Sequence, residues 1–239
     1  RSTLFPYTTL FRSRTGIRDI NNLKDAIPVM KPSNPATKVM IRGEAHLFMA
    51  YAYFQLAKRY GGVSLVKELQ QFDGDYEKIK VPRSTEKETW NYVLSECDSA
   101  AALLPSDNGR RGTKWVALAL KSRAALHAAS VAKFWPNAAL IGEAVTKKLA
   151  GGMDASDAQH YYEECIDACH EIIASGKFDL YKPAPASQQE ASENYRKIFA
   201  DARNAMPEII FSKGYFYPGV GHSMGSWHEP NQLSRESGS

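Results

Sequence analysis

The residues best suited to chemistry gather near the C-terminal end of the sequence, in the stretch 215–231. It combines aromatic rings with imidazole, amide and hydroxyl groups, and glycines in and beside it allow tight backbone paths. Flat aromatic faces can stack on the apolar C–H groups of a sugar ring, and polar groups can satisfy hydroxyls that would otherwise lose hydrogen bonds to water. The candidate ligand-binding residues are Trp227, Tyr215, Tyr217, His222, His228 and Asn231.

A purely structural role competes with this interpretation for part of the stretch. The sequence PEIIFSKGYFY at 207–217 has the composition of a strand, and alternate members of its aromatic triplet could simply pack against neighbouring helices. Trp227 lies in glycine-rich surroundings, which a packing role explains less well. Of the residues in this stretch, we therefore expect Trp227 before any other to contact the ligand.

Other clusters do not reach the pattern of a catalytic or metal site. His222, His228 and Glu229 lack the i, i+4 helical spacing of metallohydrolase motifs, and no further ligand is evident. Cys165 and Cys169 lie one helical turn apart on an apolar stripe, which is more typical of core packing than of a metal pair. The sequence predicts no metal, no cofactor and no catalytic residue.

Composition places the chain among ordinary globular proteins. It has 239 residues, of which 44% are hydrophobic and 23% charged, enough for a core that buries roughly 70% of the surface of the unfolded chain. The net charge of +4 is spread along the sequence without a long basic run, so nucleic-acid binding is not supported. No segment approaches the roughly 18 consecutive apolar residues of a membrane helix, and no secretory signal opens the sequence.

Helical patterns fill most of the chain and must position the aromatic stretch. Residues 42–60 are apolar nearly all round, as in a helix packed between others, and Gly61-Gly62 ends them. Capping boxes at Thr85 with Glu88 and at Ser156 with Gln159 each open a further apolar face. The remaining expectations are a helix opened by Thr113 and ended by Pro136, an extended connection over 63–82, a loop over 179–190 and a stop at Gly176.

These elements predict a mainly α fold, namely a superhelix of stacked helical hairpins of the tetratricopeptide kind with a small strand-containing, ligand-binding portion. Residues 1–13 carry near-duplicated pieces, TLF and TTLFRS, without helical or strand periodicity. We expect them to be a foreign segment or a disordered leader. The helical repeats then span 14–181, and 182–239 begin a truncated loop-rich ligand-binding region.

Several segments together resemble the SusD/RagB family of nutrient-binding outer-membrane lipoproteins. They are RGEAHLFMAYAYFQLAKRYGGVSLV at 42–66, VPRSTEKETWNYVLSECDSAAALLP at 81–105 and GRRGTKWVALALKSRAALHAAS at 109–130. The most specific pairing is Arg-Tyr-Gly-Gly before Val-x-Leu-Val, followed by Val-Pro-Arg-Ser at the start of a helix. Including pieces farther on, the resemblance covers about residues 17–231.

The resemblance implies a non-catalytic protein that binds oligosaccharide nutrients at the cell surface and delivers them to a SusC-like TonB-dependent transporter. It also implies attachment to the outer membrane through a lipidated cysteine, which this sequence lacks. We therefore expect a fragment without its anchor.

Two other classes stay open at this point. A cytosolic tetratricopeptide scaffold would bind peptides in a concave groove lined with Lys, Arg and Asn, but would not need an appended aromatic loop. A helical-barrel carbohydrate enzyme would need two carboxylates roughly 5–10 Å apart across a bound sugar.

Overall fold

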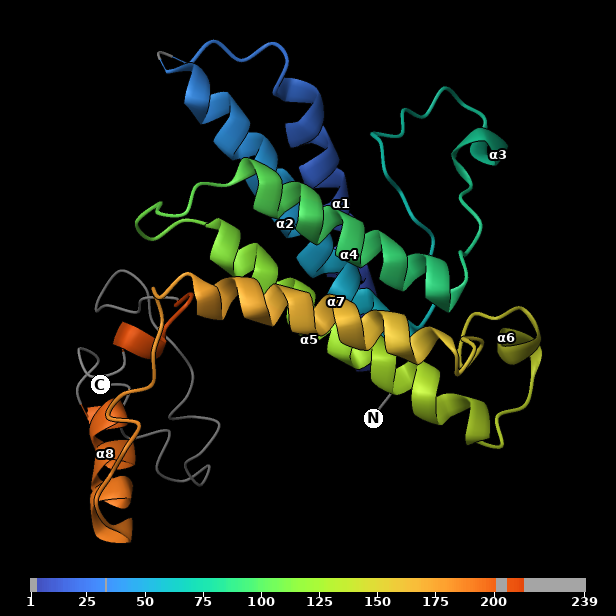
Figure 1. The fold of residues 1–239 in the computed structure, drawn as a ribbon. Coiled ribbons are helices and arrows are strands. Elements are labelled where there is room, and N and C mark those ends of the chain that lie inside the picture. Colours follow the sequence, from blue (N-terminus) through green and yellow to red (C-terminus); the bar gives the residue numbers. More distant parts are fainter. Residues whose placement is uncertain (1–3, 33, 201–205, 213–239) are drawn as a thin grey trace, which may run out of the picture.

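The computed structural model describes residues 4–32, 34–200 and 206–212, and these are mainly α-helical (Figure 1). No strand occurs within these ranges, so the mainly α prediction is confirmed. The elements, in chain order, are α1 (Leu4–Ala26), α2 (Pro35–Tyr60), α3 (Tyr76–Ile79), α4 (Glu86–Leu103), α5 (Lys114–Phe134), η1 (Trp135–Asn137), α6 (Glu143–Thr146), α7 (Asp157–Ala174), α8 (Gln188–Ala200) and η2 (Met206–Glu208).

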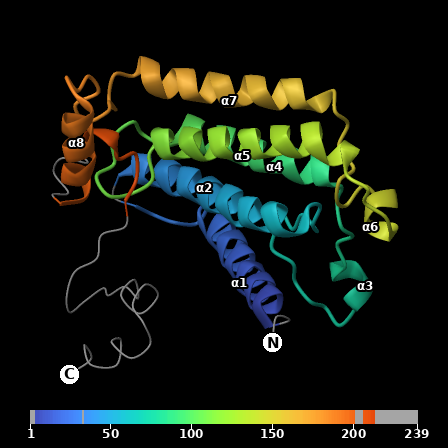
Figure 2. The same cartoon turned by 90° about the horizontal axis from the view of Figure 1, so that it is seen from below.

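The long helices form a layered stack in which each packs on the next. α1 contacts α2, α2 contacts α4, α4 contacts α5, and α5 contacts α7 (Figure 2). This serial packing is the arrangement expected of helical hairpins in a tetratricopeptide-like repeat. The connection between α4 and α5 has no regular structure, whereas the longer one between α5 and α7 contains η1 and α6.

One hydrophobic core runs through α2, α4 and α5. Its largest fully buried side chains include Trp90, Tyr53, Met49 and Val93. Burial of each such side chain contributes about 1.5–3 kcal/mol, so this core is a major source of the stability of the stack. The helix predicted to be apolar nearly all round, α2, packs against α1 and α4, which explains part of that pattern, although Phe48 and Tyr51 are more than half exposed.

Alanines on α5 allow close approach by its neighbours. Ala117, Ala124 and Ala128 are all fully buried, and Leu120 packs against the core. Small side chains let helix axes come together without gaps, in keeping with the extensive contact between α5 and α7.

The helix ends confirm three of the predicted signals and contradict one. Thr85 and Glu88 form both hydrogen bonds of a capping box, Thr113 caps α5, and Gly61 with φ of 65° caps the end of α2. Ser156 precedes α7 but makes no capping hydrogen bond. The side chain of Gln159 instead donates to Glu163 at 2.8 Å, so the second predicted capping box is wrong.

The structure differs from three further expectations. Helix α1 begins at Leu4, although no periodicity indicated regular structure over 1–13. The loop expected over 179–190 ends where α8 begins at Gln188. The strand expected over 207–217 is absent from its described part, because Met206–Glu208 form a 3-10 helix and 209–212 pair with no strand; 213–217 lie outside the described residues.

Candidate functional site

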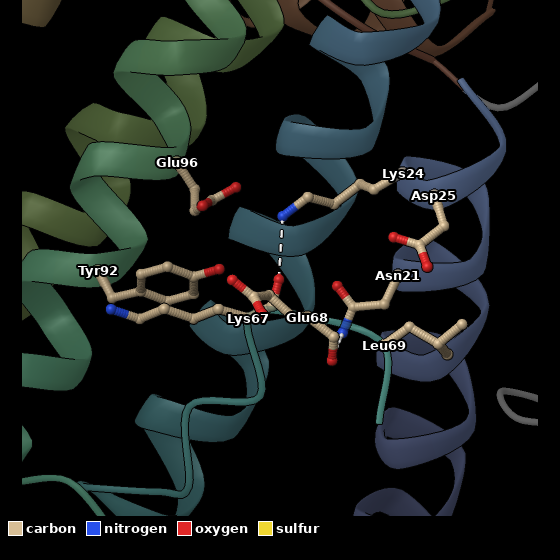
Figure 3. Close-up of a pocket in the computed structure, with 8 residues that line it drawn as sticks. All are labelled: Asn21, Lys24, Asp25, Lys67, Glu68, Leu69, Tyr92 and Glu96. Carbon is tan, nitrogen blue, oxygen red and sulfur yellow. Dashed lines mark hydrogen bonds between the residues drawn. The ribbon is translucent and has the colours of Figure 1, made fainter. Parts of the chain in front are cut away.

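A cavity of about 360 Å³ opens between α1, the segment that follows α2, and α4 (Figure 3). Its walls come from parts of the chain far apart in sequence, and Figure 3 shows side chains of both helices directed toward one shared space. The lining residues are Asn21, Lys24, Asp25, Lys67, Glu68, Leu69, Tyr92 and Glu96.

Helix α1 forms one wall and holds the irregular segment in place. The side-chain amide nitrogen of Asn21 donates to the carbonyl oxygens of Val66 at 3.1 Å and Glu68 at 3.2 Å. Lys24 Nζ donates to the carbonyl oxygen of Lys67 at 3.2 Å. These bonds supply partners for backbone carbonyls that have no regular secondary structure around them.

Tyr53 of α2 forms hydrogen bonds with the backbone of the same segment. Its hydroxyl donates to the carbonyl oxygen of Ser64 at 3.2 Å and accepts from the backbone N–H of Val66 at 2.7 Å. Burial raises the pKa of Tyr53 to about 12, so the phenol stays neutral and keeps both roles at physiological pH. The floor of the cavity is therefore fixed by side chains of α1 and α2 together.

Helix α4 supplies the opposite wall through Tyr92 and Glu96. The Tyr92 ring packs edge-on against Tyr53, with centroids 5.2 Å apart, and Lys67 Nζ lies 5.1 Å from its centroid. Glu96 Oε2 lies 2.8 Å from His46 Nδ1. Burial raises the pKa of Tyr92, and the negative charge of Glu96 raises it further, so its hydroxyl is neutral.

Two polar atoms of this cavity are buried without a hydrogen-bond partner. They are the amide oxygen of Asn21, a residue only 1% exposed, and the hydroxyl of Tyr92. The Glu96 carboxylate interacts with the Tyr92 hydroxyl closely enough to raise the pKa of Tyr92, but it is not placed as a regular hydrogen-bond partner. Buried polar groups are nearly always paired, so both atoms call for a partner such as water or a ligand.

The motif pairing that carried the family resemblance lies at the other end of the same segment. Arg83 donates to the carbonyl oxygens of Tyr60 and Gly62, and Ser64 Oγ donates to the carbonyl oxygen of Val81. A Cβ on Gly62 would lie 2.1 Å from the carbonyl oxygen of Ser84. The Arg-Tyr-Gly-Gly and Val-Pro-Arg-Ser sequences therefore contact each other and bring the two ends of the 63–82 segment together. We call the hydrogen bonds from Arg83 to Tyr60 and Gly62 the clasp.

A second cavity, of about 330 Å³, lies between α4, α5 and α7. Lys121 Nζ bridges Asp98 at 2.7 Å and Glu164 at 2.6 Å along its edge. Burial alone would lower the pKa of Lys121, but the two carboxylates raise it overall. This cluster is internally paired, which makes it a link between helices.

None of the predicted site residues lies within the described part of the chain. Trp227, Tyr215, Tyr217, His222, His228 and Asn231 all lie outside the described residues, so their role stays a prediction. Within the described residues no three His, Cys, Asp or Glu side chains form a potential metal group. Cys165 and Cys169 are partly buried on α7. Burial raises the pKa of Cys165, and its interaction with the neighbouring Cys169 raises it further.

The described residues have the helical fold of SusD-like proteins. The sequence profile of a SusD-like family described as "Starch-binding associating with outer membrane" matches residues 6–126, just over half of the chain. The chain belongs to this family. No curated protein matches it.

Solved SusD-like structures share the fold. A SusD-like protein of Bacteroides fragilis superposes with a TM-score of 0.64 at 26% identity, over 88% of this chain and 34% of its own. A SusD-like carbohydrate-binding protein of the same species gives 0.51 at 19% identity, over 79% and 32%. A laminarin-binding SusD-like protein gives 0.52 at 14% identity, over 78% and 32%. The chain therefore spans about a third of the length of these proteins.

No described helix combines the length and apolar composition needed to cross a bilayer.

Proposed function

We propose that this chain is the helical portion of a cell-surface protein that captures oligosaccharides and delivers them to a SusC-like TonB-dependent transporter in the outer membrane. The match of residues 6–126 to the SusD-like profile carries this proposal. The names of similar structures, one carbohydrate-binding and one laminarin-binding, support a glycan as the ligand class. Attachment through a lipid anchor on the outer surface belongs to the same proposal.

The proposed activity is binding without catalysis, centred on the aromatic stretch 215–231. Stacking of Trp227 on a sugar ring, with Tyr215 and Tyr217 beside it, needs no activated nucleophile. His222, His228 and Asn231 would supply hydrogen bonds to hydroxyl groups. A peptide scaffold is less well supported, because the cavity between α1 and α4 carries three carboxylates against two lysines rather than a basic lining.

The test is affinity electrophoresis of the protein in gels containing laminarin, starch or another polysaccharide, with Trp227→Ala beside the wild type. We expect retardation by at least one polysaccharide and binding at least about tenfold weaker in the variant. Trp135→Ala is the matched control, since it removes a tryptophan that is 45% exposed at the end of α5, away from the stretch 215–231 in the sequence. Binding to no polysaccharide would overturn the proposal, and equal affinity of Trp227→Ala would remove that residue from the site.

Delivery to a transporter is tested separately. The protein, co-expressed with a candidate SusC-like TonB-dependent transporter, should co-purify with it from outer membranes. Purification of each without the other would contradict this part of the proposal.

A further inference from the structure

We propose that the cavity between α1, residues 63–70 and α4 binds one polyhydroxylated unit, such as a single sugar residue, by its hydroxyl edge. The inference rests on the proposed glycan-binding function for the source of its ligand, but concerns a different place in the molecule. It starts from two unpartnered atoms, the amide oxygen of Asn21 and the hydroxyl of Tyr92, which come from different helices and face the same space (Figure 3).

The chemistry of the lining matches hydroxyl groups. A hydroxyl donates one hydrogen bond and accepts others, and the cavity offers both kinds of partner. The Asn21 oxygen can only accept, the Tyr92 hydroxyl can do either, and Lys24 Nζ has donors left beyond its bond to Lys67. Glu96, on the α4 wall, adds carboxylate oxygens that accept strongly.

A bare ion fits the lining less well than a neutral ligand. Lys24 and Lys67 stand against Asp25, Glu68 and Glu96, so charges of both signs meet in one small space. The two unpartnered groups are a neutral amide and a phenol kept neutral by burial. Opposite charges around neutral polar groups favour a ligand with hydroxyls over a cation or an anion.

The ligand would enter edge-on rather than stack on an aromatic face. Tyr92 is only 9% exposed, its ring packs on Tyr53, and Lys67 Nζ lies over the ring. No free ring face is therefore offered, and recognition depends on hydrogen bonds. The volume of about 360 Å³ equals roughly a dozen water molecules of liquid, enough for one small polyol or sugar ring.

The experiment is a titration of the whole chain, labelled with ¹⁵N, with glucose, galactose, mannose, xylose and glycerol at millimolar concentration. We expect saturable shifts of the Asn21 side-chain amide and the Leu69 backbone amide with at least one of these probes. Tyr92→Phe removes only a hydroxyl that has no partner, so it should stay folded and bind about tenfold more weakly. Tyr51→Phe makes the same chemical change on an exposed part of α2 and should bind like the wild type.

Each outcome bears on the inference. Absence of saturable shifts near the cavity would overturn the inference. Equal affinity of Tyr92→Phe and the wild type would also overturn it, because the proposed binding depends on the Tyr92 hydroxyl. If the shifts are absent but polysaccharides still retard the protein in gels, this inference fails and the proposed function stands. Shifts at the cavity without any polysaccharide binding would do the reverse and identify a site for small polyols alone.

Discussion

Two nitrogen atoms of Arg83 donate hydrogen bonds to the carbonyl oxygen of Gly62, Nε at 2.8 Å and Nη2 at 2.6 Å. Nη2 also donates to the carbonyl oxygen of Tyr60 at 2.8 Å. The end of α2 and the residues before α4 are thereby joined across the segment that lines the candidate cavity. The clasp explains why glycines after α2 and an arginine before α4 occur together in this sequence.

Replacing Arg83 by lysine should loosen this clasp. Lysine keeps the charge but cannot present two donors in a fixed planar fork to one oxygen, so we expect a loss of about 1 kcal/mol in the free energy of unfolding. Urea denaturation followed by circular dichroism measures it. Arg110→Lys, at an exposed position in the turn before α5, should change stability by less than about 0.5 kcal/mol. Equal effects of the two substitutions would contradict the role of the clasp.

Gly62→Ala should be more damaging than the loss of Arg83. The added Cβ would lie 2.1 Å from the Ser84 carbonyl oxygen and 2.7 Å from the Thr85 carbonyl carbon, and both are backbone atoms that cannot move aside alone. We expect a loss of about 3 kcal/mol, measured by thermal unfolding. Gly16→Ala is the control, because its Cβ meets nothing within 4 Å and alanine favours the helix, so stability should be unchanged or rise by up to about 1 kcal/mol.

The two predicted capping boxes should respond differently to mutation. Thr85→Ala removes a hydroxyl that accepts from the backbone N–H of Glu88, and should cost about 1 kcal/mol, with Thr85→Ser largely restoring it. Ser156→Ala should change little, because Ser156 makes no capping hydrogen bond. Chemical denaturation of the three variants measures these changes in the free energy of unfolding. If Ser156→Ala lost as much stability as Thr85→Ala, the capping box at the start of α7 would form in solution.

The fold was largely predictable from the sequence because its signals are local. Apolar spacing and turn residues placed α2, α4, α5 and α7, and the buried alanines of α5 follow from their composition. The error at Ser156 has a physical cause, since Gln159 finds a partner in Glu163 on its own helix instead of reaching back to the cap. Helix α1 was missed over its first turns because its sequence has no apolar period to reveal it.

The cavity could not be predicted, because its residues meet only after folding. Tyr92 lies outside the apolar spacing that predicts α4, and Asn21 is one of two adjacent asparagines in the sequence. Asn21 and Val66 are 45 positions apart in the sequence. Their spacing therefore gives no sign that the side-chain amide of Asn21 donates to the carbonyl oxygen of Val66. An asparagine close to the buried Ile17 and the half-buried Ile20 was the one available signal, since a buried amide must find partners.

Glu86 should make stability depend on pH in a direction opposite to most carboxylates. It is 6% exposed and accepts from the backbone N–H of Gly151 at 2.7 Å, but burial raises its pKa above the ordinary value of 4.5. The folded state therefore keeps its proton to higher pH than the unfolded state, and the contribution of Glu86 to stability falls as pH rises through that interval.

Glu86→Gln tests this, because glutamine keeps an acceptor for Gly151 and does not titrate. We expect the variant to be more stable than the wild type at pH 7, with the difference closing as pH falls below 4.5, as measured by urea denaturation across that range. Glu143→Gln should show the opposite sign, because a hydrogen bond from Lys147 lowers the pKa of the exposed Glu143, and its small stabilising effect is present at pH 7 and lost on acidification. A difference between Glu86→Gln and the wild type that stays constant with pH would mean that Glu86 is not desolvated by its burial against the Gly151 loop.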